Sequence, residues 1–579
     1  MPAGNMSLVT MLLLCLMTPS LHAQGKLELE DCVGAWLDAR AWVDAMAVPE
    51  ADESKAENHI TSGVCVILRH RGRTVGLGRA YSSPDMAKTD LIRSAVSEAI
   101  TAAAEDEVIR KLPESVKAEA GTHLTLEMEF AGELRALLGR TFQAATEKLR
   151  PGLDGIAMRH DERWWYQFPS HLRLTNAVAG PDRLYSFALA AALSPRQLEA
   201  LRDQGKISIY SFDTISLAQP KPDAVPSMLV CGDVQVTQAE VTGSQLDAAR
   251  DSLVKHILQR IYVQDDDCRL MGTYTPSTDN YEHQAPTDQD RFMIALALAK
   301  YAQSSGADES LQIEAEVAAR QLLEPRVMDP DQPVLPLKPS EAAGWCMAID
   351  ALDVEDELLE DRLQILRDYL NEMKKTEDHL LTRQSHDMAM AAAALTLAGT
   401  EADHQLGVET ARRARDVLSI HQHAGLLPWL GWVEKKNRNL DDDWTSEEQK
   451  DLASLLLIRD QAIAVQVNPN SRPDQLDAGG FQLQPGPRGV TSQSLRPAIF
   501  FAEMLQDDAF SDSARQDEWE LAHQRFLRYL LQLSCRSDHA GTWKHQERTE
   551  GAIRASTWDA RLHPTAQAMA LMVLNNTAD

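Results

Sequence analysis

Acidic, histidine, arginine and tryptophan residues recur at or just before the start of alanine-rich segments in the second half of the sequence. Carboxylates and histidines can transfer protons, arginines bind anionic groups, and tryptophans offer flat apolar faces to a sugar ring. A carbohydrate is the ligand that this set of side chains fits best. We predict catalytic roles for His386, Asp387, Asp559 and His563, and ligand binding by Arg496, Trp543, Trp558, Arg554 and, in the first half, Trp164.

Further polar residues hold equivalent positions, namely Arg291, Glu341, Asp477 and His545. Polar residues near a helix start also cap its free N–H groups, so each residue of the predicted site has a structural alternative. His421 and His423 could supply two metal ligands, but no third ligand follows at a readable spacing. The sequence therefore predicts no metal and no cofactor.

Five segments of common form must position these residues. Each has a polar start followed by alanine-rich apolar residues, and a sixth, 446–464, is a looser match; the five are 288–302, 339–352, 383–398, 492–505 and 563–574. More polar helices are predicted between them at 310–324, 356–373, 407–420 and 515–533. Repeated helix pairs indicate stacked or ringed hairpins. We predict an all-α toroid (an α/α barrel) over 276–579, with an open helical solenoid as the alternative.

The first half mixes strand and helix patterns, which is typical of an α+β domain. We predict this domain at 60–218, after an N-terminal helical segment at 24–59 and before a linker with short strands and a helix at 219–275. Its predicted elements are a hairpin at 63–81, helices at 90–112, 132–149 and 182–195, a second hairpin at 155–168, and strands at 122–130 and 206–217.

The second hairpin lies in the aromatic stretch PGLDGIAMRHDERWWYQFPS, residues 151–170, with a polar turn at His160. Strand side chains alternate, so Trp164 and Tyr166 should face one side of the sheet and Trp165 the other. The aromatic residues of this hairpin are either structural or, on an exposed face, able to stack on a ligand beside His160 or Arg163.

A family resemblance follows from the order of these motifs. VCVILRHRGRTVGLG, a long helix, LTLEMEF, the aromatic stretch, another helix and ISIYSF resemble, over roughly 60–218, the AMMECR-type domain family. The family's glycine turn is typically G-C-I-G, whereas Gly76, Leu77 and Gly78 stand here without the cysteine. The resemblance implies an architecture and puts any thiol chemistry of the family in doubt for this chain.

The segments 477–505 and 539–574 each place a glycine-containing loop before an alanine-rich helix. They resemble the loops of terpenoid-cyclase-like and six-hairpin glycosidase-like toroids. The cyclase motif D-x-D-D is absent, and the acidic run at 440–444 lacks its spacing. This resemblance implies an α/α toroid and does not favour cyclisation of terpenoids.

Composition and the N-terminus bear on location and partners. The formal net charge of −29 would repel nucleic acid. The apolar run Met6–Met17 is too short to span a bilayer and precedes Ala23, as in a signal peptide over residues 1–23. We therefore expect a secreted or periplasmic protein without a stable membrane span. Its remaining cysteines form disulfides or stay free and buried.

The sequence leaves three functions open. The first is an exported two-domain protein that binds a carbohydrate-like ligand in the toroid cavity. The second is a glycan-acting enzyme, a hydrolase, lyase or epimerase that uses carboxylates at the rim, and the third is an interaction scaffold. An enzyme requires two acids facing one cavity, a binder requires only the aromatic residues, and a scaffold requires an exposed apolar patch.

Overall fold

The protein is described by a computed structural model that divides into two compact units, Met1–Val234 and Gln235–Asp579. The signal-peptide prediction lies outside the described residues. These run from residue 27 to residue 577, except for 51–60, 82–90, 118, 140, 147–148, 150–152, 162, 171–185, 187, 231, 265–266, 325–336, 438–455, 458, 469–475, 485–488, 507–515, 537–542 and 544.

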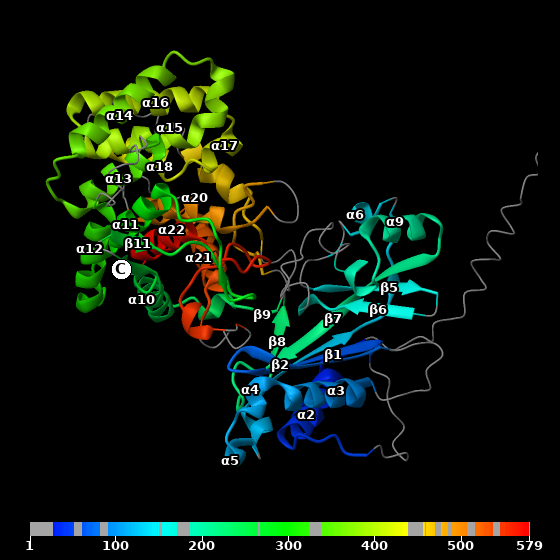
Figure 1. The fold of residues 1–579 in the computed structure, drawn as a ribbon. Coiled ribbons are helices and arrows are strands. Elements are labelled where there is room, and N and C mark those ends of the chain that lie inside the picture. Colours follow the sequence, from blue (N-terminus) through cyan, green and yellow to red (C-terminus); the bar gives the residue numbers. More distant parts are fainter. Residues whose placement is uncertain are drawn as a thin grey trace, which may run out of the picture. The chain divides into compact units, whose positions relative to one another are not determined.

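The first unit is built on an antiparallel sheet whose main path runs β2-β1-β3-β7-β5-β6 (Figure 1). The long strand β7 also pairs with β4 and β8, and β8 pairs with β9. The strands are β1 Gly63–His70, β2 Arg73–Tyr81, β3 Thr125–Ala131, β4 Arg135–Ala136, β5 Asp154–His160, β6 Arg163–Gln167, β7 Ile207–Ala218, β8 Ser227–Val230 and β9 Asp233–Val234.

Helices of this unit cover the sheet and supply an apolar core. They are α2 Leu29–Asp44, α3 Leu91–Glu105, α4 Glu107–Arg110, α5 Glu114–Lys117, α6 Phe142–Thr146 and α9 Pro195–Asp203. Helix α2 buries Cys32, Trp36, Ala39 and Val43 in the same cluster as β1, β3 and α3. The guanidinium of Arg40 donates to the carbonyls of Gly121 and Leu124, so α2 is part of this unit.

The glycine motif of the first hairpin lies inside a strand, whereas the family resemblance assigns it to a turn. Gly76 and Gly78 belong to β2, and the turn is formed by Arg71 and Gly72, which both have positive φ. A Cβ on Gly78 would lie 1.9 Å from the carbonyl oxygen of Ala95 on α3. The two glycines thus allow α3 to pack closely on the sheet.

One predicted helix of the first unit is wrong. The spacing predicts a helix over 132–149, but β4 pairs with β7 there, and among the described residues of this segment only the short α6 is helical. The sheet partner outweighs the local helical spacing at Arg135 and Ala136. In the predicted helix 182–195, residues 186 and 188–190 are helical and 191–194 are not, while 182–185 and 187 lie outside the described residues.

The second unit is helical, with two small hairpins, β10 Ile261–Gln264 with β11 Asp267–Leu270 and β12 Tyr274–Thr275 with β13 Asn280–Tyr281. Its helices are α10 Gly243–Leu258, α11 Asp288–Ala302, α12 Glu309–Leu323, α13 Pro339–Leu352, α14 Leu359–Met373, α15 Asp378–Ala398, α16 Glu401–Val417, α17 Ile420–Ala424, α18 Trp429–Asn437, α20 Leu495–Leu505, α21 Gln516–Leu533 and α22 Pro564–Asn575.

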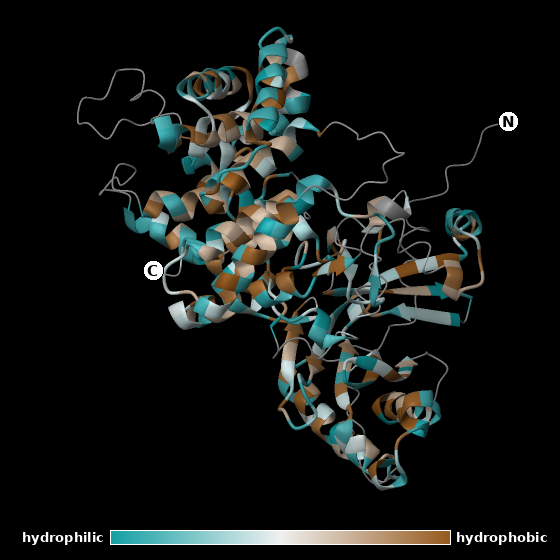
Figure 2. Ribbon diagram, turned by 60° about the vertical axis from the view of Figure 1, so that its left-hand side comes forward, coloured by the Kyte–Doolittle hydropathy of each residue, from teal (hydrophilic) through white to brown (hydrophobic). Residues whose placement is uncertain are grey.

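These helices pack in pairs, each with a buried member and a more polar one. The pairs α11/α12, α13/α14, α15/α16 and α20/α21 are in contact, and α10 packs on α22. The polar members carry hydrophilic residues on one side and hydrophobic residues on the other (Figure 2). The alanine-rich members are buried nearly all round, because small side chains let neighbouring helices approach on every side.

The buried helices contact one another in series. Helix α11 contacts α13, α13 contacts α15, α15 contacts α18, α20 contacts α22, and α22 contacts α11. The step from α18 to α20 is made by the indole N–H of Trp432, which donates to Glu503 at 2.9 Å. The sequence predicts 446–464 as the sixth alanine-rich segment; residues 446–455 and 458 lie outside the described residues, and 456–457 and 459–464 are helical. Among the described helices, α18 lies between α15 and α20 in this series.

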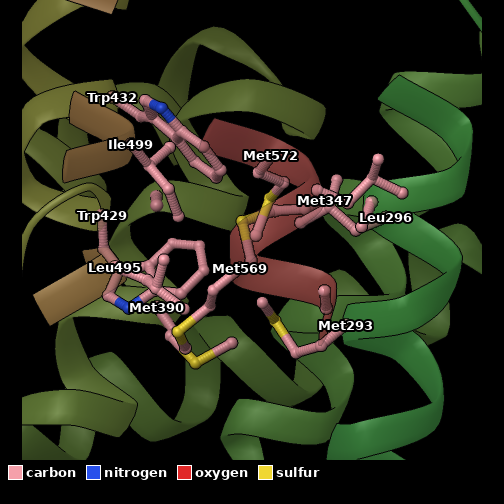
Figure 3. Close-up of a cluster of buried hydrophobic side chains, with 14 of the residues drawn as sticks. Met293, Leu296, Met347, Met390, Trp429, Trp432, Leu495, Ile499, Met569 and Met572 are labelled. Atoms are coloured by element: carbon pink, nitrogen blue, oxygen red, sulfur yellow. The ribbon is translucent and has the colours of Figure 1, made fainter. Parts of the chain in front are cut away.

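Large apolar side chains from all six buried helices, mostly methionines and tryptophans, meet in one cluster (Figure 3). The labelled members, which we call the methionine core, are Met293, Leu296, Met347, Met390, Trp429, Trp432, Leu495, Ile499, Met569 and Met572. All ten are at least 96% buried, Trp432 being the most exposed at 4%. A ligand on these helices is therefore expected near their ends, since their middle is filled.

Five cysteines of the described chain, Cys32, Cys65, Cys268, Cys346 and Cys535, are free and buried. Burial raises the pKa of the Cys65 thiol to about 12, with the charge of Glu129 acting in the same direction. Among these five the free and buried alternative holds. Within the same described residues, no helix has the length and apolar character needed to cross a membrane.

Candidate functional site

Three polar side chains with unpartnered atoms lie together around α15, α18 and α20. The rings of His386 and Trp429 are 6.3 Å apart, and the charge of Arg496 acts on His386. Among the residues described, no hydrogen-bond partner contacts Nδ1 of His386, Nε1 of Trp429 or Nε of Arg496, and all three atoms are buried. We call these residues the His386 cluster.

Electrostatics fixes the charge states of this cluster. Burial lowers the pKa of His386 to about 3, with Arg496 contributing, so its imidazole is neutral near pH 7. Burial also lowers the pKa of Arg496, to about 10, which leaves the guanidinium charged. The cluster thus offers one cation, one neutral imidazole and one indole N–H, which can bind an anionic or hydroxyl-rich group.

Asp387 follows His386 on α15 and faces another helix of the unit. Burial and the charge of Asp387 raise the pKa of Tyr369 on α14. The Tyr369 hydroxyl is buried and has no hydrogen-bond partner among the described residues. The structure thus places Asp387 near a second unsatisfied polar group.

A second group of polar residues surrounds the start of α22. His563 is the N-cap of this helix, and its Nδ1 lies 3.1 Å from the hydroxyl of Thr273. Burial and Arg561 lower the pKa of His563, while Asp559, Glu282 and Asp290 oppose this shift. We call His563, Asp559, Arg561 and Asp290 the His563 cluster.

Asp559 is held by its neighbours in the loop before α22. Its carboxylate accepts hydrogen bonds from the side chain of Arg561, the shortest at 2.7 Å. Burial alone would raise the pKa of Asp559, but the hydrogen bonds and charge of Arg561 lower it overall. Asp559 is therefore ionised near neutral pH.

The first turn of α11 touches elements of both clusters. Nε2 of Gln289 lies 3.7 Å from Sδ of Met390, which is one helical turn after His386 on α15. The next residue, Asp290, accepts a hydrogen bond from the hydroxyl of Thr565 in the first turn of α22. The two clusters therefore lie on the same side of the methionine core, at the beginning of α11 and α22.

The sequence pattern marks Asp477 only as a polar loop residue. The structure gives it a distinctive environment. It accepts a hydrogen bond of 2.5 Å from the hydroxyl of Thr557, two residues before Asp559. Burial raises the pKa of Asp477 to about 6, although Thr557 and Arg528 act in the opposite direction. No sequence pattern signals this shift, because it depends on a loop that is distant in the chain.

The remaining predicted residues of the second unit have structural contacts. The guanidinium of Arg554 donates to the carbonyls of Gln532 and Leu533. Trp543 is buried against Ala560, and Trp558 is half-buried with its backbone N–H on the hydroxyl of Ser556. These three residues shape the loops that also carry Asp559.

Three other polar residues of the sequence pattern also serve locally. Arg291 donates to the carbonyl of Glu324, and Glu341 accepts from the backbone N–H of Lys338 at the start of α13. His545 lies 2.9 Å from the carboxylate of Asp279. The contact of Glu341 is the capping alternative, whereas those of Arg291 and His545 join separate segments of the chain.

Trp164 lies in the first unit, whereas the other predicted site residues belong to the second. It packs with Tyr166 and Tyr210 on one face of the sheet, while Trp165 joins the apolar cluster on the other face. The predicted alternation of the hairpin is therefore present. The ring of Trp164 is half-buried and carries the guanidinium of Arg159 at 5.7 Å.

Comparisons with known proteins give little further information. No family model matches the chain, and no curated protein matches it. A search of solved structures finds the crystal structure of an uncharacterised protein from Pyrococcus horikoshii, with 17% sequence identity and a TM-score of 0.28. The match covers 35% of this chain and 99% of the other chain.

Proposed function

We propose that the helical unit binds a carbohydrate-like ligand that carries an acidic group, such as a uronate, beside the His386 cluster. The single observation that carries this proposal is the unpaired charge of the Arg496 side chain. Its guanidinium is charged, mostly buried, and without a hydrogen bond or ion pair among the described residues. A cation in such a place costs several kcal/mol unless it is paired, roughly 3–5 kcal/mol in mutational series. A ligand carboxylate would supply the missing partner.

The neighbouring side chains suit the rest of such a ligand. His386 and Asp387 are half-buried and can exchange hydrogen bonds with sugar hydroxyls. Trp558 and His563 are half-buried as well, and they belong to the loop that leads into α22. The filled methionine core directs the ligand to this end of the helices rather than to a central cavity.

We also propose that the six buried helices form a closed α/α toroid. The serial contacts from α11 to α22, and the return contact of α22 on α11, support a ring over an open solenoid. The packing of α10, the first helix of the unit, on α22, the last, supports the same closure.

The binding proposal is tested by calorimetric titration of the full chain with oligogalacturonate and with a neutral oligosaccharide of equal length. We expect the acidic sugar to bind more tightly, and Arg496→Gln to weaken its binding at least tenfold. Arg320→Gln is the matched control, because Arg320 is exposed on α12 beside Glu316. Absence of binding, or equal affinity in the Arg496 and Arg320 variants, would contradict the proposal.

A glycan-acting enzyme is the second candidate, favoured by the opposite pKa shifts of Asp477 and Asp559. A carboxyl with a raised pKa can act as a general acid while an ionised one stabilises positive charge or activates water. Incubation with polysaccharides should then produce new reducing ends or unsaturated products. Asp477→Asn should abolish this activity without weakening binding, and unchanged product formation would exclude the role of Asp477.

For the first unit, we propose an AMMECR-like architecture in an exported chain. The order of hairpin β1-β2, helix α3, strand β3, hairpin β5-β6 and strand β7 supports this assignment. Export rests on the sequence of residues 1–23 and would be tested by N-terminal sequencing of the secreted product, which should begin at Gln24.

A further inference from the structure

A pocket lies at the C-terminal ends of α20 and α22, away from the His386 and His563 clusters at the beginnings of these helices. Its volume is about 260 Å³, slightly below the range of about 300–1,000 Å³ usual for ligand sites, so a ligand must be small. The lining residues come from four elements and are Val241, Gly243, Leu246, Ala502, Leu505, Gln506, His523, Gln524, Leu527, Asn576 and Thr577.

One buried polar side chain of this pocket has no partner. His523 on α21 is only 8% exposed, and its buried Nδ1 makes no hydrogen bond with any residue of the described chain. Burial lowers the pKa of His523 to about 4, so its ring is neutral near pH 7 with one donor and one acceptor nitrogen. A buried nitrogen without a hydrogen bond is costly, and a hydrogen bond to a ligand group would remove that cost.

Three helix ends meet at the pocket. Helix α10 begins at Gly243, and its N-cap Thr242 accepts from the N–H of Gln245, which leaves the N–H of Gly243 for another acceptor. Helices α20 and α22 end beside the pocket, at Leu505 and Asn575. A helix N-terminus attracts a carboxylate, whereas C-terminal carbonyls attract an ammonium group.

The remaining lining is apolar or neutral. Val241, Leu246, Ala502, Leu505 and Leu527 supply hydrocarbon surface, and no side chain of the lining is an acid, lysine or arginine. The start of α10 therefore gives the pocket a positive end, and the C-terminal ends of α20 and α22 give it a negative end. The lining side chains add no charged acid or base.

We propose that this pocket binds a small zwitterion with an apolar body, the chemistry of an aliphatic amino acid. Its carboxylate accepts from the N–H of Gly243 and from His523, its ammonium group lies at the C-terminal ends of α20 and α22, and its side chain packs on Leu246 and Leu527. The pocket shares no residue with either cluster of the carbohydrate site.

Calorimetric titration of the full chain with L-leucine tests this proposal. We expect leucine to bind, and 4-methylpentanoate and isoamylamine, which each lack one charge, to bind at least tenfold more weakly. Equal affinity for leucine and either half-molecule would overturn the assignment of the positive and negative ends. Failure of leucine to bind would overturn the proposal as a whole.

Variants locate the binding in this pocket. A Cβ added at Gly243 would meet no atom within 4 Å, so Gly243→Leu should fill the pocket without strain and abolish binding. Gly34→Leu is the matched control, because Gly34 is an exposed glycine of helix α2 with equally open space. Unchanged leucine affinity in Gly243→Leu would overturn the location.

If Gly243→Leu does not fold, a second pair of variants tests the binding site instead. His523→Gln keeps a hydrogen-bonding side chain and should retain leucine binding within tenfold, whereas His523→Leu should lose it. Equal affinity of these two variants would remove His523 from the site and overturn the proposal.

Discussion

Asp477 and Asp559 are carboxyl groups on adjoining loops whose environments act in opposite directions. Asp477 is half-buried with one hydroxyl partner, and its pKa is raised to about 6. Asp559 is buried with a bidentate arginine, and its pKa is lowered. Around pH 5, therefore, Asp477 is mostly protonated while Asp559 is ionised.

These shifts predict different dependences of stability on pH. A raised folded-state pKa stabilises the protein at low pH, and this stabilisation is lost between about pH 4 and pH 6 for Asp477. Asp477→Asn should therefore raise the free energy of unfolding at pH 7.5 by about 1–2 kcal/mol and have little effect at pH 4. Denaturant titrations at both pH values would measure this difference.

Asp559→Asn is the matched control and should lower the free energy of unfolding at pH 7.5, since its ionised form is the stabilised one. A fall in stability at pH 7.5 for Asp477→Asn would show that the Asp477 carboxylate is stabilised by its surroundings. The assignment of a raised pKa to Asp477 would then be wrong.

At the residue scale, the residue types of the candidate site could be predicted from the sequence, but their hydrogen-bond partners could not. His386, Asp387, Arg496 and His563 could be selected because they stand at or near the starts of buried helices. The pairing of Asp559 with Arg561 is local, whereas that of Asp477 with Thr557 spans 80 residues. Such long-range contacts decide pKa values and cannot be read from spacing.

At the scale of elements, the start of α16 depends on one carboxylate. Asp403 accepts from the N–H and hydroxyl of Thr400 and from two guanidinium nitrogens of Arg367 on α14. The hydrogen bonds from Arg367 lower the pKa of Asp403 to about 2, against the effect of burial. This carboxylate caps one helix and joins it to another.

Asp403→Ala should lower the free energy of unfolding by about 2–4 kcal/mol near pH 7, because it removes the cap and leaves Arg367 unpaired. The stabilisation is complete above about pH 4 and is lost as pH falls towards 2. Glu360→Ala removes the exposed partner of Arg367 and should cost less than about 1 kcal/mol. Equal losses in the two variants would contradict this role of Asp403.

The methionine core makes a prediction about the buried helices. Met347→Ala should lower the free energy of unfolding by about 2–5 kcal/mol, since it leaves a cavity, whereas Met347→Leu should cost less than about 1.5 kcal/mol. Leu521→Ala is the surface control on α21, where Leu521 is 47% exposed, and should change stability by about 0.5 kcal/mol or less. A loss in Met347→Ala no larger than in Leu521→Ala would contradict a filled centre.

Helical periodicity predicted most elements of the second unit because the alanine-rich and amphipathic patterns are long. It missed α18, Trp429–Asn437, because this helix is short and carries tryptophans rather than alanines. The prediction of a helix at 132–149 was wrong for another reason. The pairing of β4 with β7 joins segments that are distant in the sequence, and local spacing does not show it. Gly76 and Gly78 could not be placed correctly without the position of α3.

At the scale of the whole molecule, the two units should separate under limited proteolysis. Residues 237–239 are exposed and follow the end of the first unit at Val234. We expect subtilisin to cut there first and to leave one fragment of mixed structure and one almost wholly helical by circular dichroism. Early cuts within α11 or α22, or a helical fragment rich in strand, would contradict two independent units.

The most direct test of the account is chemical modification of Arg496 with phenylglyoxal in the full chain, followed by mass spectrometry with and without oligogalacturonate. The free guanidinium of Arg496 should react without ligand, and the acidic sugar should protect it, while exposed Arg320 reacts equally in both conditions. Protection of Arg496 confined to the acidic sugar is the predicted result. Equal modification of Arg496 with and without the sugar would contradict a ligand site at this residue.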